Sequence, residues 1–120
     1  MGKVIGKVRG LGQLYANGLE RQEVHVPKEE AESLPYREGA RVEIDLLLGD
    51  YIYKAGLRAT KIKPYIWICP NLLDRRDRRV SLAEALAENG FKKNQPVRLR
   101  FTNASIRLEP TPASKPSSAA

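Results

Sequence analysis

The sequence predicts a mainly β protein in which seven short strands and two short helices form a small barrel with an internal pseudo-twofold repeat. The first observation is a likeness between residues 36–45 and 91–100, which match at an offset of 55 residues. In each segment an aromatic and a basic residue precede Gly39 or Asn94, which readily adopt positive φ, and an alternating strand follows. The second observation is that a strand ending in proline and a helix precede each segment.

The strands are predicted from apolar alternation bounded by turn residues. Seven segments show this pattern, at residues 4–9, 23–27, 40–48, 51–59, 65–69, 96–101 and 105–109. Gly49 and Asp50 form a turn, residues 60–64 connect two strands, and 102–104 form a last turn. Residues 10–22 and 71–79 lack periodicity and are predicted to be loops.

Two helices complete the order of elements. Residues 28–34 begin with three glutamates, which suits a helix N-terminus, and Pro35 ends this helix. The second helix follows Ser81, which forms a capping box with Glu84, and it ends at residues 89–90. The predicted core consists of Val24, Val26, Val42, Ile44, Leu46, Ile66, Ile68, Leu82, Leu86, Val97, Leu99, Phe101, Ile106 and Leu108.

The chain of 120 residues has room for one domain, predicted at residues 1–110. Residues 111–120 are rich in Pro, Ser and Ala and are predicted to be a disordered tail. We expect no membrane span and no signal peptide, because no apolar run has the required length. A single cysteine, Cys69, excludes an intramolecular disulfide and is expected in the core. These features favour a cytoplasmic protein.

The net charge of +7 is unevenly distributed along the chain. Residues 20–50 hold four bases and nine acids, whereas residues 51–80 hold eight bases and two acids. A polyanion would therefore meet an attractive side and a repulsive side of the molecule. The alternative is a basic surface that serves solubility alone.

Part of the first repeat carries a recognisable pattern. The stretch at residues 26–44, with Pro27-Lys28, Leu34, a basic residue at Arg37, Gly39 and Val42, resembles swapped-hairpin regulators and antitoxins of the AbrB and MazE type. In those proteins one unit needs a second chain to complete the barrel. Here the second copy at residues 66–100 is expected to complete it within one chain.

The order β-β-α-β-β-β-α-β-β over residues 3–110 resembles the DNA-binding pseudobarrel of plant B-three-type transcription factor domains and restriction endonuclease effector domains. The resemblance implies a seven-stranded pseudobarrel that binds duplex DNA sequence-specifically. It implies two arms in the major groove, here residues 9–22 and 57–65, at a separation suited to straddling the duplex. The role implied is the recognition component of a restriction or defence system, or a regulator.

The two arms carry residues that suit nucleic-acid recognition. The first arm offers Arg9, Gln13, Tyr15, Asn17, Arg21 and Gln22, and the second arm and adjoining strand offer Arg58, Thr60, Lys61, Lys63, Tyr65 and Trp67. Guanidinium and amide groups read base edges, so Arg58 is the expected guanine contact, while Lys61 and Lys63 are expected at phosphates. The alternatives are a flexible surface loop for the first arm and a lysine-rich hairpin that discourages edge pairing for the second.

The densest local charge lies in the run from Arg75 to Arg79. Arg75, Arg76, Arg78 and Arg79 are predicted to make secondary phosphate contacts. The run could instead bind an acidic protein partner, or form a solvated turn neutralised in part by Asp74 and Asp77.

Nothing in the chain indicates catalysis. One histidine and one cysteine cannot form a usual His/Cys metal site, and no nucleophile–base grouping is evident. The prediction is therefore a non-enzymatic protein without metal or cofactor. Two other functions remain open: RNA or single-strand binding, with Tyr15, Tyr65 and Trp67 as stacking groups, and docking of an acidic protein partner. The oligomeric state is open, and a monomer is compatible with these features.

Overall fold

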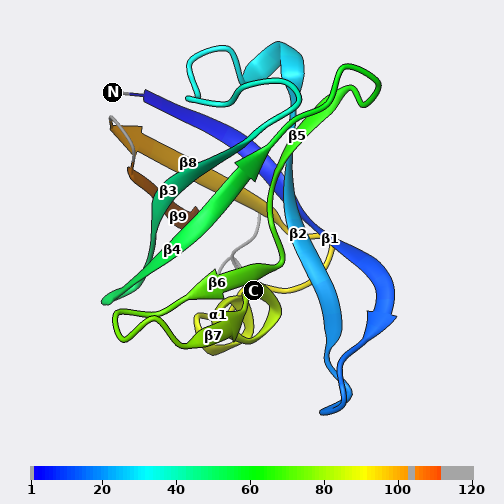
Figure 1. Cartoon of the computed structure of the whole chain (residues 1–120), viewed down its shortest axis with the longest axis vertical. Helices are drawn as coiled ribbons and strands as arrows, with labels where there is room; N and C mark the ends of the chain where they lie inside the picture. The colour runs from blue at the N-terminus through cyan, green and yellow to red at the C-terminus, as the bar shows by residue number, and fades with distance from the viewer. Residues whose placement is uncertain (1, 103–104, 112–120) are drawn as a thin grey trace, which may run out of the picture.

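Seven strands close into a barrel in the computed structural model of the chain, which describes residues 2–102 and 105–111 (Figure 1). Around the ring the order is β3-β9-β8-β1-β2-β5-β4, and β4 pairs with β3 to complete it. The pairs are antiparallel except for β3 and β9, which are parallel. The strands are β1 (Gly2–Leu14), β2 (Glu20–Pro27), β3 (Arg41–Leu48), β4 (Tyr51–Arg58), β5 (Tyr65–Ile68), β8 (Pro96–Thr102) and β9 (Ser105–Pro110). The predicted mainly β barrel of seven strands is confirmed.

The barrel interior is filled by the residues that alternation predicts. Val24 and Val26 of β2 are buried, as are Ile66 and Ile68 of β5. Every residue of the predicted core is buried except Val42, which is half-buried near the start of β3. Burial of this apolar surface is the main favourable contribution to folding, and it fixes which face of each strand points outward.

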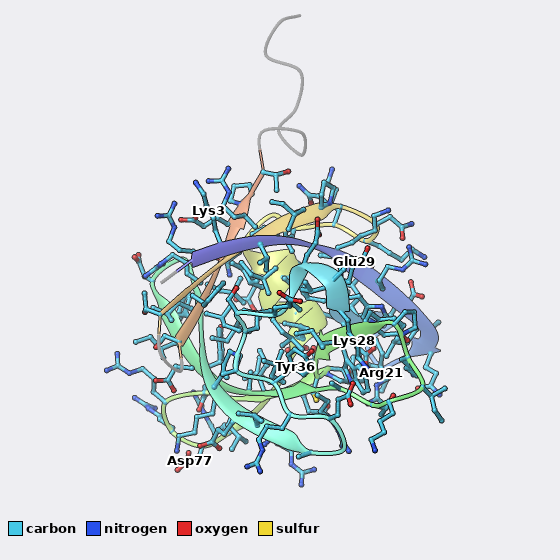
Figure 2. The ribbon with its side chains drawn as sticks, turned by 90° about the horizontal axis from the view of Figure 1, so that it is seen from above. Lys3, Arg21, Lys28, Glu29, Tyr36 and Asp77 are labelled. Carbon is cyan, nitrogen blue, oxygen red and sulfur yellow. The ribbon has the colours of Figure 1, made fainter. Side chains whose placement is uncertain are left out.

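One end of the barrel is closed by the helix α1 (Leu82–Glu88), as predicted. The hydroxyl of Ser81 accepts a hydrogen bond from the backbone N–H of Glu84 at 3.0 Å, and Gly90 follows the helix with a φ of +83°. Leu82, Ala83, Ala85 and Leu86 of α1 are buried. Figure 2 looks along the barrel from the upper end of Figure 1 and shows α1 inside the ring of strands.

The other end is covered by residues 28–40, where the predicted helix is only a single 3₁₀ turn, η1 (Lys28–Glu30). Its backbone bonds join residues three apart: Ala31 N–H donates to the Lys28 carbonyl, and Leu34 N–H donates to the Ala31 carbonyl. The predicted short helix is present as a 3₁₀ turn, which is shorter than the expected range of residues 28–34. A segment this short, without a side-chain cap, forms too few hydrogen bonds to offset the free-energy cost of nucleating an α-helix. Buried Ala31 and Leu34 hold it on the barrel instead.

Two segments predicted to be loops are hairpins. Residues 10–22 form the projecting end of the β1–β2 hairpin (Figure 1), whose turn is closed by the Tyr15 N–H donating to the Leu19 carbonyl at 2.8 Å. Gly12 has a φ of +81° within a register shift, and this bulge disrupts the alternation that would have predicted a strand.

The second misassigned segment, residues 71–79, contains β6 (Asn71–Leu73) and the start of β7 (Arg79–Ser81). This hairpin joins the barrel where Leu73 pairs with Lys54 of β4. Its strands have three residues each, which is too short for a periodic pattern. Asp74 shapes the turn by accepting hydrogen bonds from the N–H groups of Arg76 and Arg78.

The two halves of the predicted repeat agree at selected positions. Gly39 and Asn94 both have positive φ, at +81° and +67°, and Arg41 and Pro96 begin β3 and β8. The internal symmetry itself stays a prediction. The expected tail lies outside the described residues from 112 onward, and so do residues 103–104 of the expected turn. Over the ranges that are described, no helix has the length and apolar character needed to cross a membrane.

Candidate nucleic-acid interface

A row of polar and aromatic residues crosses the outer face of the barrel. Strand pairing places Lys7 opposite His25, His25 opposite Trp67, Trp67 opposite Arg58, and Arg58 opposite Arg41. The row therefore runs over β1, β2, β5, β4 and β3. The neighbours of His25, Trp67 and Arg58 along their strands are buried in the core, as is Val8 beside Lys7, so these four side chains point outward. Arg41, at the start of β3, is itself exposed.

This face is hollowed beside the β1–β2 hairpin. Three adjoining depressions, of about 390, 340 and 420 Å³, share Asn71, and Arg41 and Arg79 each line two of them. We call this surface the outer groove. The residues lining it that can recognise nucleic acid are Gln13, Tyr15, Asn17, Arg21, Arg41, Arg58, Trp67, Asn71 and Arg79.

The outer groove is cationic. Four arginines line it, at positions 21, 41, 58 and 79, against two glutamates, Glu23 and Glu84. Arg58 is exposed, and its guanidinium makes no side-chain hydrogen bond or ion pair with any residue in the described ranges. A concave surface with an excess of one sign of charge concentrates the field of that charge, so the excess of arginines favours anions in the groove.

Two buried donors in the groove lack partners. The Nε of Arg21 and the hydroxyl of Tyr15 are buried and have no hydrogen-bond partner in the part of the chain that the structure describes. The guanidinium of Arg21 lies 5.9 Å from the centre of the Tyr15 ring, and its Nη1 donates a long bond of 3.5 Å to Gln13. Buried polar groups are normally satisfied. These two groups therefore suit a ligand with hydrogen-bond acceptors.

Arg41 is a groove residue that the sequence interpretation missed. A Cβ atom at Gly56 would collide with its side chain, so the lack of one lets Arg41 lie flat across β4. This position brings Arg41 near Cys69, whose thiol pKa is raised by burial despite the nearby arginines. One feature of the sequence could have indicated Arg41. It lies opposite Arg58 in a β-hairpin, which can be inferred if the register of the hairpin is known.

Asn17 lies at the groove but has a structural role. Its Oδ1 accepts a hydrogen bond from Leu19 N–H at 3.0 Å, and its Nδ2 donates to Glu84 of α1 at 3.0 Å. The amide therefore holds the hairpin turn against the helix. One N–H and one lone pair of the amide remain for its expected role in base contacts.

The aromatic residues of β5 are covered by cations and by one another. His25 stacks on Tyr65 with ring centres 4.1 Å apart, and the Lys63 ammonium lies 5.1 Å from the centre of the Trp67 ring. Lys63 also lies 5.6 Å from the Tyr65 ring centre. Lys63 lies beside the outer groove, because it packs on Trp67, which lines the groove. The contacts also cover faces of the Tyr65 and Trp67 rings on which bases would otherwise stack.

The two predicted arms lie at opposite ends of β2. Glu20, which begins β2, pairs with Leu14 beside the first arm, whereas Pro27, which ends it, pairs with Tyr65 beside the second. Seven steps along a strand span about 23 Å. The outer ends of the two arms are therefore separated along β2 and do not lie side by side. The outer groove is lined by residues of both arms, among them Arg21 of the first and Arg58 of the second. Thr60, Lys61 and Lys63 line none of its three depressions.

The remaining predicted residues are dispersed. Arg9 is exposed on β1, opposite Glu23, and Gln22 is half-buried opposite Gly10. Arg75, Arg76 and Arg78 line a separate hollow of about 310 Å³ with Tyr51. Arg78 pairs with Asp74 at 3.0 Å. Figure 2 shows Asp77, in the same turn, on a part of the rim away from Arg21.

Glu20 fixes the root of the first arm. Its carboxylate accepts hydrogen bonds from the Lys93 ammonium at 2.9 Å and from the Gly12 N–H at 2.8 Å. Both bonds favour the ionised form and lower the pKa of Glu20 below its usual value of 4.5.

The lowered pKa of Glu20 predicts an acid-sensitive hairpin. A carboxyl whose pKa is lower in the folded state adds stability above its unfolded pKa, and that stability is lost as the pH falls through the folded pKa. We expect amide exchange at Gly12 to accelerate in the native protein as the pH is lowered from neutral to below the usual Glu pKa of 4.5 and on through the lower folded pKa, after correction for intrinsic rates. Glu20→Gln should exchange faster at neutral pH and change less on acidification. An identical pH dependence in both proteins would contradict this role.

Over residues 2–102 and 105–111, no group of three or more His, Cys, Asp or Glu side chains is arranged to hold a metal ion. Comparisons with known proteins found no matching family model, no matching curated protein and no matching solved structure.

Proposed function

We propose that this protein binds duplex DNA sequence-specifically through the outer groove, as a pseudobarrel recognition domain of the kind its strand order resembles. One observation carries the proposal: guanidinium and amide groups from five separate strands meet in one cationic hollow, represented by Arg21, Arg58 and Asn71. Guanidinium and amide groups are the side chains that read base edges. The proposed setting is a restriction or defence system, or transcription regulation.

The contacts that already cover the aromatic rings favour binding of duplex over single-stranded nucleic acid. Binding of single strands relies on open aromatic faces on which bases stack. Tyr65 is stacked on His25, and Trp67 lies under the Lys63 ammonium. By contrast, the Arg58 guanidinium is exposed and unpaired among the described residues. The groups left available are hydrogen-bond donors, which suit the base edges and phosphates of a duplex.

The positions of the arms give each part of the surface a separate role. The turn of the β1–β2 hairpin and the 59–64 connection lie at opposite ends of β2, so their cations would contact backbone phosphates at two separated points. The outer groove would face the base edges. The distance of about 23 Å along β2 corresponds to roughly two thirds of a helical turn.

Selection from a random oligonucleotide pool that contains both duplex and single-stranded forms tests the proposal. The expected result is enrichment of duplexes that share a sequence. Enrichment of single strands or structured RNA would overturn the proposal in favour of the alternative nucleic-acid function. Failure to retain any nucleic acid, with an acidic protein co-purifying after nuclease treatment, would favour a protein-docking module.

Substitutions at two cations should separate base readout from backbone binding. We expect Arg58→Ala to reduce discrimination between selected and scrambled duplexes by about 1–3 kcal/mol, because a base-edge contact is lost. Lys61→Ala should weaken both duplexes alike. The measurement is fluorescence anisotropy with each duplex. Lys3→Ala, at an exposed cation of β1 that lines none of the groove's depressions, is the control. Equal effects of the Arg58 and Lys61 substitutions on both duplexes would remove the assigned roles.

A further inference from the structure

The tip of the 59–64 connection presents an isoleucine to solvent. Ile62 is 93% exposed, more than any other large hydrophobic residue in the described ranges, and it lies between Lys61 and Lys63. Scattered exposed apolar residues are common, but most are partly covered. An exposed apolar side chain between two cations suits a ligand whose outer surface is anionic and whose interior is apolar.

The tip is held in place from both sides. The N–H of Lys63 donates to the Thr60 hydroxyl at 3.3 Å across the tip. On the barrel side, the backbone N–H of Lys28 donates to the Pro64 carbonyl at 2.9 Å, and the Lys28 ammonium donates to the Thr60 carbonyl. Glu38 fixes that ammonium through an ion pair of 2.6 Å. The loop is thus ordered before any ligand binds, which lowers the entropic cost of binding.

The tip also adjoins the outer groove. The Lys63 ammonium packs on Trp67, which lines the groove and pairs across the strands with Arg58. A duplex lying in the groove would therefore extend toward Lys63 and Ile62. This continuity, together with the positive charge beside the tip, indicates the same nucleic-acid ligand rather than an unrelated one.

We propose that Ile62 is an apolar wedge that enters a groove of the bound duplex and opens a base step, while Lys61 and Lys63 hold the flanking phosphates. The proposal rests on the duplex binding proposed above. Inserted apolar side chains unstack base steps and bend the duplex, and the cost is offset by the added contacts. Pyrimidine–purine steps open most easily, so the wedge favours a TA or CA step at one end of the site.

Bending of a labelled duplex tests the wedge. The probe is the duplex recovered by selection, with donor and acceptor dyes at its ends and 2-aminopurine beside its TA or CA steps. Wild-type protein is expected to raise energy transfer and 2-aminopurine fluorescence. Ile62→Ser should bind on the order of tenfold more weakly and lose most of both signals, because the apolar contact is gone. Ile62→Leu should retain them. Ile52→Ser, at a partly exposed isoleucine outside the groove, is the matched control.

The possible results distinguish a failure of the wedge proposal from a failure of the duplex-binding proposal. Equal bending by wild type and Ile62→Ser, with intact duplex binding, overturns the wedge and leaves the duplex function standing. Absence of duplex binding by the wild type overturns both. Phosphatidylserine vesicles serve as a second probe: binding to them that is lost in Ile62→Ser, without any duplex signal, would assign the tip to a membrane surface and overturn the proposal.

Discussion

Raising the salt concentration from about 50 to 200 mM should weaken duplex binding about a thousandfold, if about six phosphates are neutralised. Each neutralised phosphate releases condensed counterions, and this release becomes less favourable as salt increases. The cations available for phosphates are Arg21, Arg41 and Arg79 of the outer groove, Lys7 of the adjoining row, and Lys61 and Lys63 of the 59–64 connection. Fluorescence anisotropy titrations of a labelled duplex at several salt concentrations measure the slope of log affinity against log salt.

A variant series calibrates this slope. Lys61→Ala should lower its magnitude by about one, because one phosphate contact is removed. Arg76→Ala should leave it close to the wild-type value if the Arg75–Arg79 turn stays off the duplex. A reduced slope in Arg76→Ala would instead confirm the secondary phosphate contacts predicted for this turn. A flat salt response of the wild type would count against nucleic-acid binding through cations altogether.

Leu86→Ala is expected to destabilise the fold by about 2–5 kcal/mol, since it leaves a cavity under the closed end of the barrel. Leu86 is fully buried on α1. The same helix carries Glu84, which holds Asn17 and thereby the turn of the β1–β2 hairpin. Loss of packing at Leu86 should therefore also loosen the first arm. Urea unfolding followed by circular dichroism measures the change in free energy.

The control for Leu86 is a leucine of the same type on the surface. Leu14 is 70% exposed at the end of β1, so Leu14→Ala should change the unfolding free energy by less than about 0.5 kcal/mol. A loss below about 1 kcal/mol for Leu86→Ala would show that α1 contributes little to the barrel core. Duplex binding by Leu86→Ala at a temperature where it stays folded would report on the hairpin position separately.

Most of the fold was predictable because the inward face of each strand is apolar and the turns are marked by glycine, asparagine and proline. Alternation placed Val24 and Val26 in the core, and the capping pair of Ser81 and Glu84 placed α1. The errors have local causes. The bulge at Gly12 interrupted the alternation of β1, and a run of three glutamates at residues 29–32 suggested a helix where only a 3₁₀ turn forms.

The candidate site was predictable in composition but not in arrangement. Charge and residue type singled out Gln13, Arg21 and Arg58, and the structure brings these three together. It adds Arg41 and Asn71, which no local pattern marks, because their proximity depends on strand register. Register is set by turns and by pairing across the whole ring, and single-sequence patterns do not carry it. For the same reason the opposite placement of the two arms could not be inferred.

The closure of the ring has a consequence for biosynthesis. β1 pairs with β8, and β3 pairs with β9. The strands that are synthesised first therefore cannot complete their pairing until the last strands have been synthesised. Until the C-terminal strands leave the ribosome, β1 and β3 each present an unpaired edge that can recruit other nascent chains. Completion of the domain is therefore a late, long-range event that is slow relative to local structure, and it depends on protection from premature association.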